Sequence, residues 1–245
     1  MVYFLKLVKN DLRNVIRDRF LVFGMFFYPI MIIIFSRILV HLISPRIEGS
    51  FEFASPAFFP IFFMLFSLFI PIIYGFISAF LLLDERDEHL LTVLKVMPIS
   101  RNNFLIIRMF FMSLFAFIVL LIFPPLSGLV DMSQFNYFDY IPVAILYSLF
   151  APFIALFVSS FATNKVQAFA IFKISGTVFM IPLFAFFLIQ DNFKYMFSPI
   201  PNFWTFMALD SLLQNGTLDF VPLVIGFVYH LALIAVLFYI FNKKN

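Results

Sequence analysis

An uncharged run of residues is followed at once by a charged one, and the contrast decides the fold: residues 57–83 read AFFPIFFMLFSLFIPIIYGFISAFLLL, and residues 84–101 read DERDEHLLTVLKVMPISR. A helix that crosses a bilayer needs about 20 mostly apolar residues, and the first run meets that need. The second run has five charged residues and a histidine in its first six positions. A membrane protein that concentrates its charges in this way typically presents them to a partner in water.

The composition of the whole chain agrees with a membrane protein. Hydrophobic residues make up 64% of the 245 residues and charged residues 12%, and the mean hydropathy is +1.07. Soluble domains carry about 25% charged residues, so the sequence excludes a soluble globular fold. The absence of cysteine excludes disulfide and thiol chemistry. The length suits one membrane domain over residues 1–245.

Six runs of residues are long and apolar enough to span a bilayer. They are residues 20–43, 57–83, 104–130, 140–162, 167–190 and 221–241. Backbone polar groups in lipid need partners within the segment, which favours helices. Barrel strands would alternate in hydropathy, and these runs do not. The predicted fold class is an all-α integral membrane protein with six transmembrane helices.

The positive charges predict the orientation of these spans. Eleven Lys and Arg residues lie in the segments on the side of both chain ends, and two lie in the loops on the other side. Because cytoplasmic loops carry the excess of Lys and Arg, both termini and the charged run are predicted to face the cytoplasm. The expected location is a plasma membrane, that of a bacterial cell, which the chain crosses several times.

Residues 1–19 predict an amphipathic helix that lies on the membrane surface. Leu5, Val8 and Leu12 recur at helical spacing, while Arg13 and Arg17 occupy the other face. Such a helix places its apolar face in the acyl boundary and its basic face toward anionic lipid, which makes membrane lipid an expected partner. The alternative is a plain extension of the first span.

The charged run itself predicts a short amphipathic helix within a loop over residues 84–103. Acidic residues suit the first turn of a helix, Leu91 and Leu94 form an apolar edge, and Pro98 ends the helix. Leucines beside charges are typical of a docking surface. An ordinary solvated turn is the alternative, although it leaves the leucines unexplained.

This run resembles the signature of type-2 ATP-binding-cassette exporter permeases. The matching residues are Glu85, Arg86, Asp87, Glu88, Leu91, Leu94, Pro98, Ile99, Ser100 and Arg101. His89 and Leu90 stand where the family pattern has Gly-Thr. The resemblance implies that Glu85, Arg86, Asp87, Glu88, Leu91, Leu94, Pro98 and Ser100 belong to a coupling helix that contacts an ATPase subunit.

The same resemblance implies the partners and the cofactors. Two ATPase subunits would bind ATP and Mg²⁺, and a second permease subunit, identical or related, would complete the path; no nucleic acid is expected. The chain has no Gly-x-x-x-x-Gly-Lys-(Ser/Thr) phosphate loop and is therefore predicted to be a transport subunit without its own ATPase site or cofactor. No metal site is predicted, because the three histidines lie far apart in the sequence.

The connection over residues 191–220 is too polar for a span and too apolar for an ordinary loop. It resembles the short outer helices of the family, which re-enter the outer leaflet between the fifth and sixth spans. Trp204 in this segment is either an interfacial anchor or a substrate contact. In the family the first, second and fifth spans line the path, which makes Tyr74 and Lys173 candidate path residues. Trp204 is a third candidate, because the outer helices of the family cap the path.

Two residues inside the spans keep two interpretations each. Lys173 is either a functional intramembrane cation or a lysine that reaches back to the interface. Arg37, one turn from His41, is part of a functional pair or of an interfacial one. The phenylalanine-rich walls favour an amphiphilic cargo such as a drug, peptide or lipid. An ATP-independent transporter or channel, and a membrane-embedded enzyme, are the alternative functions.

Overall fold

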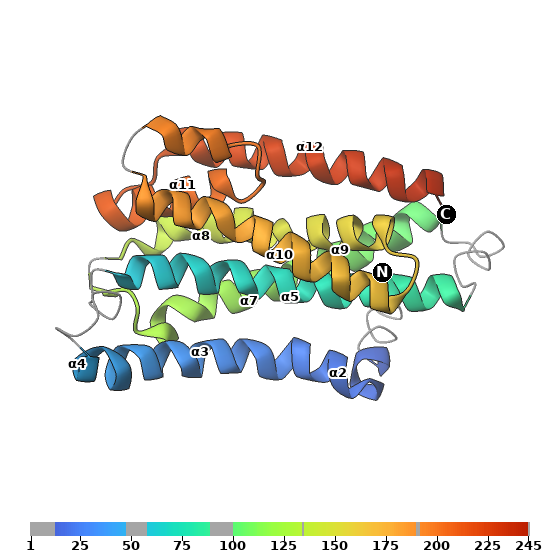
Figure 1. The fold of residues 1–245 in the computed structure, drawn as a ribbon, viewed down its shortest axis with the longest axis horizontal. Helices are drawn as coiled ribbons and strands as arrows, with labels where there is room; N and C mark the ends of the chain where they lie inside the picture. The colour runs from blue at the N-terminus through green and yellow to red at the C-terminus, as the bar shows by residue number, and fades with distance from the viewer. Residues whose placement is uncertain (1–12, 48–57, 89–99, 134, 190–191, 245) are drawn as a thin grey trace.

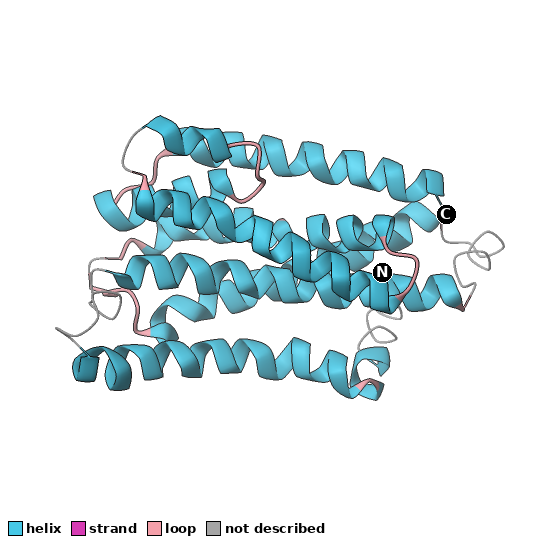
Figure 2. Cartoon of the chain, viewed as in Figure 1, coloured by secondary structure: helices cyan, strands magenta, loops and turns pink. Residues whose placement is uncertain are grey.

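The computed structural model describes residues 13–47, 58–88, 100–133, 135–189 and 192–244. Within these ranges the chain is mostly helical with short loops, and no strand occurs in them (Figure 2). The long helices run along one another, with α3 at one edge, α12 at the opposite edge and α5, α7, α9 and α10 between them (Figure 1).

Among the described residues, six helical stretches are long and apolar enough to cross a membrane, as the sequence predicts. The first comprises α2 (Arg19–Val22), η1 (Phe23–Phe27), α3 (Tyr28–Ile38), η2 (Leu39–Ile43) and α4 (Ser44–Ile47). The next three are α5 (Phe59–Asp87), α7 (Arg101–Ser127), and α8 (Tyr137–Ser148) with α9 (Phe150–Phe161). The last two are α10 (Lys165–Leu188) and α12 (Phe220–Lys244), and between them lie η6 (Asn192–Phe197) and α11 (Phe203–Asn215).

Helix α5 forms the centre of the bundle. Of its apolar span 83% is buried, whereas 22% is buried in the first and the sixth spans. Gly75 allows this central position, because a Cβ atom there would lie 2.5 Å from the carbonyl oxygen of Ala151 and 2.7 Å from the Cβ of Ile154. Small residues let helix backbones approach closely in membranes, so Gly75 sets the distance between α5 and α9.

Several spans contain prolines, and tyrosine hydroxyl groups of neighbouring helices compensate for three of them. A proline has no N–H group, so the carbonyl four residues earlier loses its helical partner. Before Pro29 this carbonyl belongs to Met25, which accepts a hydrogen bond of 3.0 Å from the Tyr74 hydroxyl of α5. Such side-chain compensation is what makes proline tolerable within lipid, and here it also joins the first span to the second.

The proline pair at 124–125 in α7 is compensated in the same way. The carbonyl of Leu120 accepts a 3.2 Å hydrogen bond from the Tyr140 hydroxyl, and the carbonyl of Leu121 accepts one from Tyr137. Both tyrosines lie in α8. The two broken helical bonds of α7 are therefore replaced by bonds to the helix that follows it.

The connection between the fifth and sixth spans contains two short helices, η6 and α11, in agreement with the sequence. The Tyr229 hydroxyl of α12 donates to the carbonyl of Pro199 over 2.6 Å, and the Asn202 amide donates to the carbonyl of Phe179 in α10. Burial raises the pKa of the Asp210 carboxyl in α11, and a hydrogen bond from Gln214 partly opposes that rise. Re-entry of these helices into the outer leaflet stays a prediction.

Candidate functional site

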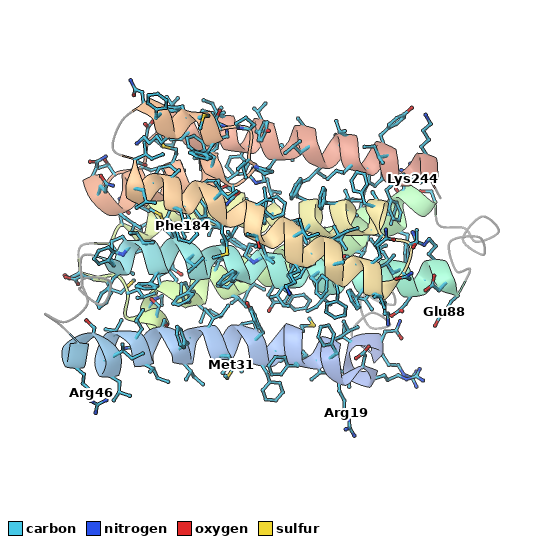
Figure 3. All side chains as sticks on the ribbon, in the orientation of Figure 1. Arg19, Met31, Arg46, Glu88, Phe184 and Lys244 are labelled. Atoms are coloured by element: carbon cyan, nitrogen blue, oxygen red, sulfur yellow. The ribbon has the colours of Figure 1, made fainter. Side chains whose placement is uncertain are left out.

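Charged side chains gather at one end of the bundle, which we call the charged end. Figure 3 shows Arg19, Glu88 and Lys244 at this end and Arg46 at the opposite one. Helix α5 ends here and α7 begins here, so the two described flanks of the predicted coupling segment, residues 88 and 100, lie at the charged end. Three of the predicted coupling residues, Leu91, Leu94 and Pro98, lie outside the described residues.

Glu85 and Arg108 form an ion pair inside the bundle. Both terminal nitrogens of the Arg108 guanidinium donate to Glu85, one to each carboxylate oxygen. The two residues are 6% and 2% exposed, and the guanidinium also lies 4.7 Å from the centre of the Phe104 ring. Paired carboxylate and guanidinium groups of this geometry are the strong hydrogen-bonded pairs of proteins. The pair fixes the end of α5 to the first turns of α7.

This position of Glu85 corrects the expectation that the acidic residues after residue 83 form the first turn of a new helix. Helix α5 continues to Asp87, because Arg108 neutralises the carboxylate that would otherwise be costly to bury. Glu85 therefore faces the protein, while Asp87 and Glu88 are exposed. Of the acidic residues in the signature, these last two are available to a partner.

The residues on either side of Glu85 contact the turn between α9 and α10. Arg86 donates to the carbonyl of Ala162 over 3.0 Å and to that of Thr163 over 2.7 Å. A cation is favourable at these carbonyls, since they terminate helix α9. Asp84 pairs with Lys165 at 2.7 Å, with more than a third of each side chain exposed, so this second pair contributes little to stability.

The other ends of the spans are joined at the same place. Ser100 caps α7, because its hydroxyl accepts a 3.2 Å hydrogen bond from the backbone of Asn103. Near the end of the chain, Asn242 donates to Asn102 over 3.1 Å and Lys244 donates to the carbonyl of Ser160 over 2.9 Å. At the charged end, hydrogen bonds and ion pairs therefore connect α5, α7, α9, α10 and α12.

The predicted surface helix is described for its last part only. Residues 13–17 are helical, Arg13 and Arg17 are exposed, and Val15 is fully buried. The helix stops at Asp18, whose carboxylate accepts from the backbone of Phe20 over 2.9 Å and so caps α2. A separate helix therefore precedes the first span, and the predicted lipid-facing residues Leu5, Val8 and Leu12 lie outside the described residues.

The three candidate path residues have different surroundings. Tyr74 is 3% exposed and its hydroxyl donates to the carbonyl of Met25, so it lies inside the bundle. Trp204 is half-buried in α11, edge to face with the ring of Phe203. Lys173 is exposed on α10. Of the three, Lys173 presents the most open polar group.

Arg37 and His41 contact each other, and Arg37 also binds the C-terminal end of helix α7. The guanidinium of Arg37 donates to the carbonyl of Leu126 over 2.6 Å and lies 3.1 Å from Nε2 of His41. Gly128, with a φ of 74°, is the left-handed residue that follows α7. The last carbonyls of a helix lack internal partners. This contact supplies one and joins the first and third spans at the end opposite the charged end.

An apolar groove opens between α9, α10 and α12. Its volume is about 540 Å³. Phenylalanines of α9 and aliphatic residues of α10 and α12 form the walls: Phe153, Phe157, Phe161, Ile174, Val178 and Leu233. Among the described residues no cluster of three or more His, Cys, Asp or Glu side chains could hold a metal ion.

Sequence reasoning missed two contacts, that of Arg108 at the charged end and that of Tyr140 near the far end of α7. The signal for Arg108 was present, since an arginine within a span needs a carboxylate partner and Glu85 begins the signature. Tyr140 gave no such signal, because its contact with Leu120 depends on how α8 lies against α7.

Comparisons with known proteins agree with a membrane export protein. The family model described as "Fluoroquinolones export permease protein Rv2686c-like" matches residues 11–238. Two curated relatives from Mycobacterium tuberculosis are "Fluoroquinolones export permease protein Rv2686c" of strain H37Rv and "Fluoroquinolones export permease protein MT2760" of strain CDC 1551. Each is 27% identical over 239 residues, which cover 97% of this chain and 93% of the relative. The match covers most of the chain, spans and charged end included, so this protein belongs to the Rv2686c-like family of fluoroquinolone export permeases.

Proposed function

We propose that this protein is the membrane subunit of an ATP-driven exporter. Separate ATPase subunits, two in number, would bind ATP and Mg²⁺ and would dock at the charged end. A second permease subunit, identical or related, would complete the path. Family membership supports export, and the coupling signature at residues 85–101 supports the ATPase partner.

The single observation that carries the proposal is the buried pair of Glu85 and Arg108. It joins α5 and α7, the helices before and after residues 89–99 in the sequence. A force on this segment would therefore reach both helices together. Arg86 passes the same force to the turn before α10. Because α5 is the most buried span, a displacement of its end moves the packing of the whole bundle.

The coupling residues then divide into two roles. Asp87 and Glu88 are exposed and supply charge for the ATPase surface, with Leu91, Leu94 and Pro98 as the apolar part of the contact. Glu85, Arg86 and Ser100 hold the segment in place, the first two through the contacts described above and Ser100 as the cap of α7. Contact residues are expected to alter association, and positioning residues to alter transmission.

The proposed cargo is an amphiphilic molecule. The two mycobacterial relatives are named for the export of fluoroquinolones, and this chain has an apolar groove of about 540 Å³ with aromatic walls. Pockets for drug-sized ligands are mostly apolar, with a few polar groups that orient the ligand. The proposed location is a bacterial cell membrane with the charged end in the cytoplasm, supported by the Lys and Arg asymmetry.

The test is co-purification and fluoroquinolone efflux with the ATPase of the same transport system. Leu91→Ala and Leu94→Ala are expected to lower ATPase association by tenfold or more, because truncation of an anchor in an interface commonly costs about 2 kcal/mol. Glu52→Ala in the predicted outer loop is the control and should leave association and efflux unchanged. Parent-like association and efflux in both leucine variants would refute the coupling role. Fluoroquinolone efflux that persists without any ATPase would favour an ATP-independent transporter.

A further inference from the structure

Lys173 is a cation placed well inside a span. It lies eight residues after Lys165, the first residue of α10, which corresponds to about 12 Å along the helix axis. The four-carbon stem of a lysine spans about 6 Å, half of that distance. The ammonium group therefore cannot regain the level of Lys165 by extending its side chain along α10.

The surroundings of Lys173 are open on the same face of the helix. Thr177, one turn further, is exposed, and its hydroxyl donates back to the carbonyl of Lys173 over 3.2 Å. A Cβ added at Gly176 would meet no atom within 4 Å. Residues three and four apart share a helix face, so Lys173, Gly176 and Thr177 form one open polar surface, which we call the Lys173 patch.

The other cations inside the described spans have partners. Arg108 is paired with Glu85, and Arg37 binds the carbonyl of Leu126. No acceptor for the Lys173 ammonium occurs among the described residues, and a charge at the bilayer centre without a partner is costly. An ionisable residue inside a span is by default a candidate functional site.

The described spans provide no anionic side chain at the depth of Lys173. The acidic side chains of the described spans lie near the span ends: Asp84, Glu85 and Asp87 at the charged end, and Asp139 at the start of α8. The described part of a second copy would bring the same set at the same depths. The described spans therefore contain no carboxylate that would reach Lys173 across a symmetric pair.

An aromatic surface adjoins the patch on the side of the charged end. Phe169 lies one turn before Lys173 and is 44% exposed, as is Phe20 of α2. Their ring centres are 5.5 Å apart, and the Phe169 ring also packs edge to face on Phe76 and Phe80. Aromatic rings favour this edge-to-face contact with further rings, so the surface offers a rigid platform to a planar aromatic molecule.

We propose that Lys173 binds the carboxylate of the cargo while Phe169 and Phe20 contact its aromatic rings. The substrate class is thus an aromatic acid, and this assignment rests on the proposed export function. The positive charge of Lys173 favours an anionic cargo. Because residues 169 and 173 are one helical turn apart, the aromatic ring and the carboxylate of the cargo should be separated by about the same distance. Lys173 acts as the specificity-determining residue, because a neutral cargo would gain nothing from its charge.

The experiment compares a fluoroquinolone with the methyl ester of its carboxylate. Binding to the purified chain and efflux from vesicles with the ATPase are measured for the parent, Lys173→Gln, Lys173→Arg and the control Lys194→Gln. Lys173→Gln is expected to weaken binding of the acid at least tenfold, the usual effect of losing a charged hydrogen bond. Binding of the ester to Lys173→Gln should change less than twofold. Lys173→Arg keeps the charge and should still prefer the acid over the ester.

Three results would overturn the assignment. If Lys173→Gln binds the acid as tightly as the parent does, the charge of Lys173 plays no role. If binding of the acid and of the ester weakens equally, Lys173 acts on the structure of the site. If the parent loses binding of the acid to the same extent in vesicles that lack anionic lipid, Lys173 interacts with a lipid headgroup instead. A parent that binds the acid but exports neither compound with ATP would refute the proposed function and leave the binding site standing.

Discussion

Arg108 holds both carboxylate oxygens of Glu85 inside the bundle, with 1% and 8% of the two side chains exposed. The first glutamate of the coupling signature therefore belongs to the core that supports the segment. An ion pair in this position is costly to break, because either partner alone would remain as an unpaired buried charge.

Removal of one member of this pair is expected to destabilise the protein. Arg108→Met leaves the Glu85 carboxylate buried without its partner, and breaking such a pair costs about 3–5 kcal/mol. Thermal unfolding of the purified chain in detergent, followed by Trp204 fluorescence, measures the loss. The double variant Glu85→Leu with Arg108→Met removes both charges and should recover most of the stability. If the double variant is as unstable as the single one, packing and not charge accounts for the effect.

The double variant also separates stability from coupling. It retains apolar contact between α5 and α7 but loses the bidentate hydrogen bonds that fix their relative position. We expect it to fold and to bind the ATPase while hydrolysis is poorly coupled to efflux. Parent-like coupling would show that the ion pair serves stability alone.

The hydroxyl of Tyr140 is expected to matter because of Pro124. Tyr140→Phe leaves the carbonyl of Leu120 without its 3.2 Å hydrogen bond, and a buried polar group without a partner costs about 1–3 kcal/mol. Pro124→Ala restores the backbone N–H that this carbonyl would use in a regular helix. Tyr140→Phe should therefore cost about 1 kcal/mol less in the Pro124→Ala background.

The control for this cycle is Tyr239→Phe, at a tyrosine of α12 that is 67% exposed. It should leave the melting temperature unchanged in either background. Equal effects of Tyr140→Phe with and without Pro124 would contradict the idea that the hydroxyl compensates for the proline.

Gly75→Ala is expected to separate α5 from α9. The added methyl group would lie 2.5 Å from the carbonyl oxygen of Ala151, which belongs to the backbone and cannot rotate away. Overpacking of this kind costs about 1–3 kcal/mol, visible as a lower melting temperature. Gly176→Ala adds the same methyl group to open space and should keep the stability of the parent. Similar melting temperatures for both variants would mean that α5 and α9 are packed less closely.

The spans could be predicted from the sequence because hydropathy and length are local properties. The end of the second span could not, since the burial of Glu85 depends on Arg108, 23 positions away in the chain. The hydrogen bonds of Tyr74, Tyr137 and Tyr140 were hidden for the same reason. A tyrosine can bond to a carbonyl that lacks its helical partner because of a proline only when the two helices lie in a particular register. Hydropathy does not encode that register. Lys173 stood out from the sequence, but its exposure and its lack of a carboxylate neighbour required the packed bundle.

The orientation in the membrane stays a prediction and is open to a direct test. The chain has no cysteine, so a single cysteine introduced at residue 131 or 245 is the only target of an impermeant thiol reagent. In intact cells Asp131→Cys should be labelled and Asn245→Cys should react only after the membrane is opened, because the Lys and Arg excess retains its side in the cytoplasm. Lysed cells, in which both positions should react, are the control for access. Labelling of residue 245 from outside would place the charged end away from cytoplasmic ATP, and the proposed docking of an ATPase there would be wrong.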